Sequence, residues 1–97
     1  MTKTLYAEFT VKPGCEERVA EMMRELTHHV RAEPGNVIFH PYTLQERPNN
    51  YFVFEVYRDQ AAFEEHINAE YGRKFNAELA DLIEEGGSEL TWLQAVQ

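Results

Sequence analysis

The chain has 97 residues, enough for one hydrophobic core, so we expect residues 1–97 to form a single domain. Nine Lys and Arg against 17 Asp and Glu give a formal net charge of −8, which disfavours binding to nucleic acid and to anionic membrane surfaces. The single Cys15 excludes an intrachain disulfide, and no apolar run approaches the roughly 20 residues of a membrane-spanning helix. The start of the chain also lacks the pattern of a secretory signal. These features predict a soluble cytoplasmic protein.

The first third of the chain predicts a strand followed by a helix. Apolar and polar residues alternate over residues 4–12, which is the period of a strand with one apolar face. A Pro-Gly pair at 13–14 ends this strand. Apolar residues then recur at three- and four-residue steps over 16–32, which indicates an amphipathic helix, and a second Pro-Gly pair at 34–35 ends it.

The middle of the chain predicts a hairpin. Residues 36–45 are rich in β-branched and aromatic side chains and contain Pro41, which is typical of an edge strand or a bulge. Residues 46–50 contain a proline and two asparagines and predict the turn, and 51–57 predict the next strand. Large apolar residues occupy both faces of that second strand, so we expect both faces to be covered.

The last third of the chain predicts two helices and a strand. Asp59 can cap a short helix over 60–68, a longer helix follows over 71–84, and residues 89–96 are extended. The order β-α-β-β-α-(α)-β predicts an α+β, ferredoxin-like split βαβ fold with a four-stranded antiparallel sheet and its helices on one face. The uncovered apolar face then predicts a homodimer, because pairing two sheets removes that face from water.

His66 and Glu55 are the candidates for catalysis. His66 lies on the apolar stripe of the 60–68 helix, where an imidazole can exchange a proton with a ligand between helix and sheet. The alternative is a core histidine with one hydrogen bond. Glu55 lies among aromatic and β-branched residues, so it must find donors or have its pKa raised. It either orients His66 or the substrate, or pairs with an arginine or a buried hydroxyl.

Other polar and aromatic residues can line a small-molecule site or belong to the core. His40 is a candidate for a pocket or for an interface between subunits, whereas His28 and His29 diverge around a helix and are expected at its surface. We expect no metal site, and no glycine pattern for a nucleotide cofactor is present. The candidates for contact with a substrate are His40, Tyr51, Phe63, Phe75 and Trp92.

Four segments together resemble the antibiotic biosynthesis monooxygenase family: YAEFTVKPG, RAEPG, YFVFEVYRD and AAFEEHINAEYGRKF. They follow one another with fitting separations over nearly the whole chain. The resemblance implies a dimeric α/β barrel that needs no cofactor. It also implies that a phenol, quinol or anthrone is deprotonated in an apolar cavity and that the anion reacts directly with O2. In that scheme His66, after the third strand, accepts or relays the proton.

The same resemblance leaves other activities open. FEVYRDQAAFEEH is also similar to proteins that isomerise the phosphorylated autoinducer-2 signal, which commonly carry a second histidine where this chain has Tyr71. A tyrosine there can donate a proton but is a poor base near neutral pH. In haem-degrading relatives the position of the iron-binding histidine corresponds to Asn76, which disfavours haem. A dimeric binding module without turnover is a further alternative.

Overall fold

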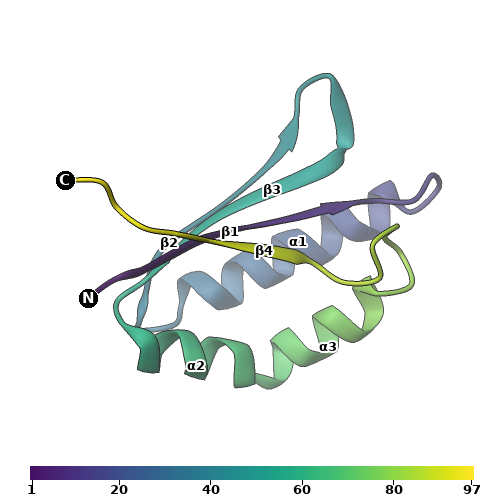
Figure 1. Ribbon diagram of the computed structural model, residues 1–97. Helices are drawn as coiled ribbons and strands as arrows, with labels where there is room; N and C mark the ends of the chain where they lie inside the picture. Colours follow the sequence, from purple (N-terminus) through teal and green to yellow (C-terminus); the bar gives the residue numbers. More distant parts are fainter.

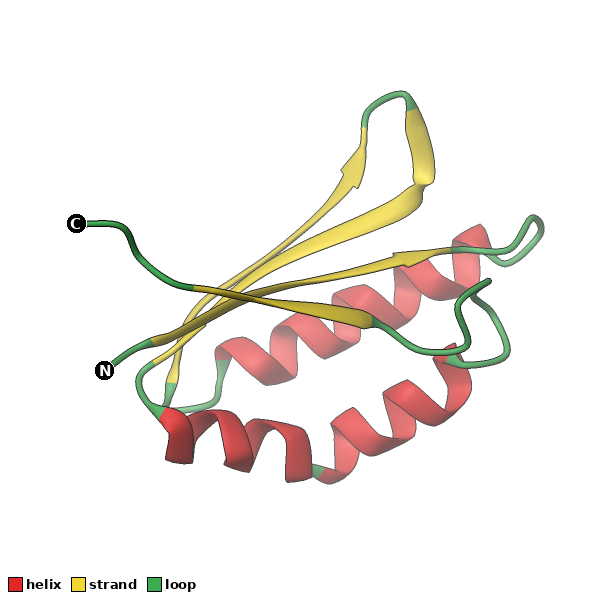
Figure 2. Ribbon diagram, viewed as in Figure 1, coloured by secondary structure: helices red, strands yellow, loops and turns green.

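Three helices cover one face of a four-stranded sheet in the computed structural model, which describes residues 1–97. The elements in chain order are β1 (Lys3–Thr10), α1 (Glu16–Arg31), β2 (Asn36–Leu44), β3 (Arg47–Tyr57), α2 (Gln60–Asn68), α3 (Glu70–Leu79) and β4 (Glu89–Leu93). The sheet is antiparallel with the order β2-β3-β1-β4. Figures 1 and 2 show α1, α2 and α3 together on one side of this sheet. The predicted α+β, ferredoxin-like fold is confirmed.

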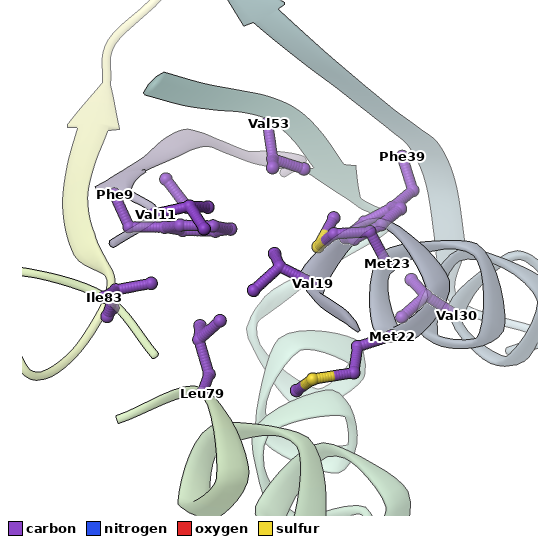
Figure 3. Packing of buried hydrophobic residues seen from close by; sticks show 11 residues of the cluster. Phe9, Val11, Val19, Met22, Met23, Val30, Phe39, Val53, Leu79 and Ile83 are labelled. Atoms are coloured by element: carbon purple, nitrogen blue, oxygen red, sulfur yellow. The ribbon is translucent and has the colours of Figure 1, made fainter. Parts of the chain in front are cut away.

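The core forms where the apolar face of β1 meets α1. Alternate residues Leu5, Ala7 and Phe9 of β1 are buried, as the strand period requires. In Figure 3 the side chains of the larger cluster converge from the sheet, from α1 and from the end of α3. The residues labelled there are Phe9, Val11, Val19, Met22, Met23, Val30, Phe39, Val53, Leu79 and Ile83. The sheet and the two longer helices are therefore held together by one apolar layer.

The predicted helix over 71–84 is too long at its C-terminal end. Helix α3 ends at Leu79, because the chain after it pairs with the end of β1 instead of continuing the helix. Ile83 forms an isolated antiparallel bridge with Val11, and the N–H of Glu84 donates to the carbonyl of Thr10 at 2.9 Å. Ile83 is buried in the core, as its position in the predicted helix implies, but its backbone pairs with Val11 instead of forming a helix.

The predicted turn at 46–50 and the predicted last strand also have different bounds. Strand β3 already begins at Arg47. The pairing of β2 with β3 shifts from Thr43 opposite Tyr51 to Leu44 opposite Arg47, so residues 48–50 lie within β3 without a partner in β2. Strand β4 ends at Leu93, where its pairing with Thr4 of β1 ends. Pairing with a neighbouring strand, which local composition does not encode, determines these limits.

No helix covers the opposite face of the sheet. Val53, Glu55 and Tyr57 of β3 are buried under the helices, and the alternate residues Phe52 and Phe54 point the other way and are half-buried. Tyr6 of β1 stacks on Phe52 there, with ring centroids 4.7 Å apart. Figures 1 and 2 show no element on this side. None of the helices has the length and apolar character needed to cross a membrane.

Candidate active site

A cavity of about 300 Å³ lies between the sheet and the helices. Its walls are mostly apolar, with Leu5 and Phe9 from β1, Val53 from β3 and Phe75 from α3. Its few polar side chains belong to Glu55, His66, Asn76 and Ser88. Neither Lys nor Arg lines it. A cavity of this size, with apolar walls and a few polar side chains, is typical of a site for a small organic molecule.

His66 reaches this cavity from α2. Asp59 caps the helix, because its Oδ1 accepts the N–H of Ala62 at 2.9 Å, and this fixes the register that turns Phe63 and His66 inward. The side chain of His66 is 15% exposed, and its ring lies 4.8 Å from the ring of Tyr57. The imidazole is thus held between aromatic rings with one edge at the cavity.

Glu33 contacts the other edge of the imidazole. Its two carboxylate oxygens lie 3.0 and 3.2 Å from Nδ1 of His66, and its Oε2 accepts the hydroxyl of Tyr71. Glu33 occupies the turn after α1. Gly35 packs so closely on Ala62 that an added Cβ would lie 2.3 Å from the Ala62 Cβ. This close approach brings Glu33 within reach of the next turn of α2, where His66 lies.

Glu55 lies on the cavity side of His66. Its Oε1 accepts the hydroxyl of Tyr57 at 2.7 Å, so this carboxylate has a buried hydroxyl partner, which is one of the alternatives that the sequence left open. Burial raises the pKa of Glu55, and the Tyr57 hydrogen bond opposes that shift. Burial and the neighbouring Glu55 raise the pKa of Tyr57, which keeps it a donor. The Oε1 of Glu55 is 3.9 Å from Nε2 of His66, too far for a direct hydrogen bond.

The structure brings four of the predicted residues to one place. His66, Glu55, Phe63 and Phe75 all line the cavity. Tyr71 is joined to this group through Glu33 and does not line the cavity itself. Its ring stacks instead on His29, with centroids 4.7 Å apart.

Three of the candidates for substrate contact, His40, Tyr51 and Trp92, do not line this cavity. His40 is exposed, because it pairs with Phe54 and so points to the uncovered face of the sheet. Tyr51 faces the helices but stacks on the buried Phe9 at 4.9 Å, nearer the β2–β3 hairpin. Trp92 packs edge-on against Phe63, with centroids 4.7 Å apart, outside the cavity.

Glu33 and Tyr57 are the site residues that the sequence analysis missed. Glu33 lies in the Glu-Pro-Gly segment, which was interpreted only as a helix end, and Tyr57 was counted only as a strand residue. Glu33 is recognised as a site residue by its contact with His66, and Tyr57 by its hydrogen bond to Glu55. No group of three His, Cys, Asp or Glu side chains is arranged to hold a metal ion. Asn76 lines the cavity.

Comparison with known proteins shows the family. Residues 3–78 match the family model described as antibiotic biosynthesis monooxygenase, and the chain belongs to this family. The Synechocystis protein sll1783 is 29% identical over 73 residues, which are 75% of this chain and 50% of that protein. The chain thus matches about half the length of this curated relative.

Solved structures share the fold. Rv0793 from Mycobacterium tuberculosis superimposes with a TM-score of 0.91 at 20% identity, over 100% of this chain and 97% of the other. A solved antibiotic biosynthesis monooxygenase superimposes with a TM-score of 0.91 at 22% identity and full coverage of both chains. At these identities the likeness concerns the fold.

Proposed function

We propose that this protein is a cofactor-independent monooxygenase that oxidises a small phenol, quinol or anthrone-like substrate with O2. The observation that carries the proposal is the 3.9 Å gap between Nε2 of His66 and Oε1 of Glu55 at the wall of an apolar cavity. A substrate hydroxyl placed there can contact both polar atoms while its ring lies among apolar side chains. Membership of the monooxygenase family supports the same reading.

His66 acts as the general base in this mechanism. Nε2 takes the proton of the substrate hydroxyl, which lies beside Glu55 and its Tyr57 partner. Apolar walls favour an anion whose charge is spread over an aromatic ring, and they hold the ring against Phe75 in one orientation. O2 accepts electrons from the anion. One oxygen atom ends in a product carbonyl and the other leaves as water, so the substrate supplies all four electrons.

The lining of the cavity favours this substrate class over a phosphorylated sugar-like signal. An isomerase for such a signal needs cationic or backbone groups to hold the phosphate. The cavity contains no Lys or Arg side chain to hold a phosphate. A binding module would bind a ligand in the same cavity but convert none of it, so the activity assay distinguishes a binding module from a monooxygenase.

We further propose that the working form is a homodimer in which two uncovered sheet faces pack together. The half-buried aromatic residues Tyr6, Phe52 and Phe54 support this, because apolar surface left in water costs about 25 cal/mol per Å². Sedimentation should show a dimer, and Phe54→Lys should shift it toward monomer. A wild-type protein that sediments as a stable monomer would contradict the proposal.

Oxygen uptake tests the activity directly. Wild-type protein is incubated with a panel of quinols and anthrones, and uptake is compared with that of His66→Ala and of His28→Gln. His28 is an exposed histidine on α1 without a contact to the cavity, so it is the matched control. Loss of a base typically costs 10²–10⁴-fold in rate, and His66→Ala should lose roughly that much while the control keeps its activity. Conversion without oxygen would refute the oxygenase mechanism, and unchanged uptake in His66→Ala would remove His66 from it.

A further inference from the structure

We propose that Glu33, held by Tyr71, is a positioning residue that keeps the Nδ1 proton on His66 and so leaves Nε2 as the basic atom facing the cavity. The effect on turnover rests on the proposed function. The proton position itself is a property of the resting protein and can be measured without any substrate.

The contacts of Glu33 determine which nitrogen carries the proton. A carboxylate only accepts hydrogen bonds, and both of its oxygens lie within 3.2 Å of Nδ1. Nδ1 must therefore be the donor. A neutral imidazole has one N–H, so Nε2 keeps its lone pair. The side chains of His66 and Glu33 are only 15% and 16% exposed, which limits competition from water.

The second carboxylate near His66 does not reverse this assignment. Oε1 of Glu55 lies 3.9 Å from Nε2, so no hydrogen bond there draws a proton to that nitrogen. Burial raises the pKa of Glu55, and its Oε1 already accepts the Tyr57 hydroxyl. Two carboxylates thus flank one imidazole in different environments: Glu33 pairs with it, and Glu55 faces the space for the substrate.

Tyr71 fixes Glu33 from the side away from the cavity. Its hydroxyl donates to Oε2 of Glu33, and burial together with Glu33 raises the pKa of Tyr71, so the phenol stays protonated. The ring is itself held by stacking on His29. Tyr71 therefore acts through Glu33, which replaces the sequence-based expectation that it donates a proton to the substrate.

The arrangement also prepares the site for the charge that forms during catalysis. When Nε2 takes a proton, the imidazolium is already paired with Glu33, as in a histidine oriented by a carboxylate in hydrolase triads. The other charged groups near Glu33 are Arg58 and Glu65, which line a separate surface hollow with it. Neither contacts His66, so the carboxylates that compensate the new charge are Glu33, 3.0 Å from Nδ1, and the more distant Glu55, 3.9 Å from Nε2.

Nitrogen NMR of the His66 ring tests the proposal in the resting protein. In the neutral form, wild-type protein should show the proton on Nδ1. Glu33→Gln replaces a charged acceptor by a neutral amide oxygen, which forms a weaker hydrogen bond, and should lower the ratio of this tautomer to the other by about fivefold. Glu33→Asp should restore part of the ratio, and Tyr71→Phe should lower it less than Glu33→Gln. Glu65→Gln, a substitution in the same hollow, should leave it unchanged.

The outcomes separate this proposal from the proposed function. A wild-type spectrum with the proton on Nε2, or an unchanged ratio in Glu33→Gln, overturns the role of Glu33 even if the enzyme is active. If Glu33→Gln does not fold, the wild-type tautomer and the Tyr71→Phe ratio decide. Wild-type protein that lacks turnover but shows the Nδ1 tautomer and its loss in Glu33→Gln refutes only the monooxygenase. In an active enzyme, Glu33→Gln should lower kcat with KM little changed.

Discussion

Replacement of Gly35 by alanine should destabilise the protein and separate Glu33 from His66. The added Cβ would lie 2.3 Å from the Cβ and 3.3 Å from the Cα of Ala62. Carbon atoms pack best at about 3.5–4.0 Å, so the turn and α2 must move apart by roughly 1 Å or more. Overpacking of this kind costs about 1–3 kcal/mol, which outweighs the gain of about 0.4–1 kcal/mol from a stiffer unfolded chain.

Thermal unfolding followed by circular dichroism measures this effect. In a domain of this size 1 kcal/mol shifts Tm by about 4–8 °C, so Gly35→Ala should lower Tm by at least several degrees. Gly87→Ala is the matched control, because nothing lies within 4 Å of its added Cβ. The control should unfold close to the wild-type temperature.

A compensating substitution makes the test sharper. Ala62→Gly alone should destabilise α2 by about 1 kcal/mol through helix propensity. In the Gly35→Ala background the same substitution removes the clashing methyl group and should raise Tm instead. This reversal of sign identifies the contact between the two residues. A Gly35→Ala protein that melts with the wild type, or an Ala62→Gly effect of the same sign in both backgrounds, would refute the reasoning.

Substitutions at three further positions test individual contacts. Burial raises the pKa of Glu55 above 4.5. The free energy of unfolding that protonated Glu55 contributes is therefore full below pH 4.5 and is lost as the pH rises through the raised pKa. Denaturation of wild type and of Glu55→Gln between about pH 4 and 8 should show that the stability of the wild type relative to the variant falls over this range. Asp59→Ala should cost about 1 kcal/mol by removing the cap on Ala62, and Asp59→Asn should cost less. Arg18→Gln, which breaks the exposed pair with Glu78 between α1 and α3, should cost under about 1 kcal/mol by urea denaturation.

The fold was predictable because its signals are local. The alternation in β1, the helical period of α1 and the Pro-Gly pairs each lie within a few residues, and their order is sufficient for the ferredoxin-like arrangement. The ends of elements were less predictable. Ile83 continues the apolar period of α3 but pairs with Val11, more than 70 positions earlier in the chain, and no local pattern encodes that pairing.

The candidate site was predictable only in part, for a similar reason. His66 and Glu55 stand out because ionisable side chains among apolar neighbours need an explanation. Glu33 follows a helix and precedes a proline, where an acidic residue needs none. Its distance to Nδ1 of His66 depends on how a turn meets α2, 33 positions further along the chain. Tyr51 shares the strand parity of the buried Val53 and Glu55, but parity alone does not predict its stacking on Phe9.

The Glu-Pro-Gly segment shows why this part of the site depends on backbone packing. Pro34 ends α1, which leaves the carboxylate of Glu33 in a turn and free to face α2. Gly35 then lets that turn approach α2 at Ala62, and its carbonyl accepts the N–H of Arg58 at 2.8 Å. His66 lies one helical turn beyond Ala62, on the same face. A longer side chain at position 35 or 62 would therefore separate the carboxylate from the imidazole without altering either, so the polar half of the site is specified by two small residues that carry no chemistry.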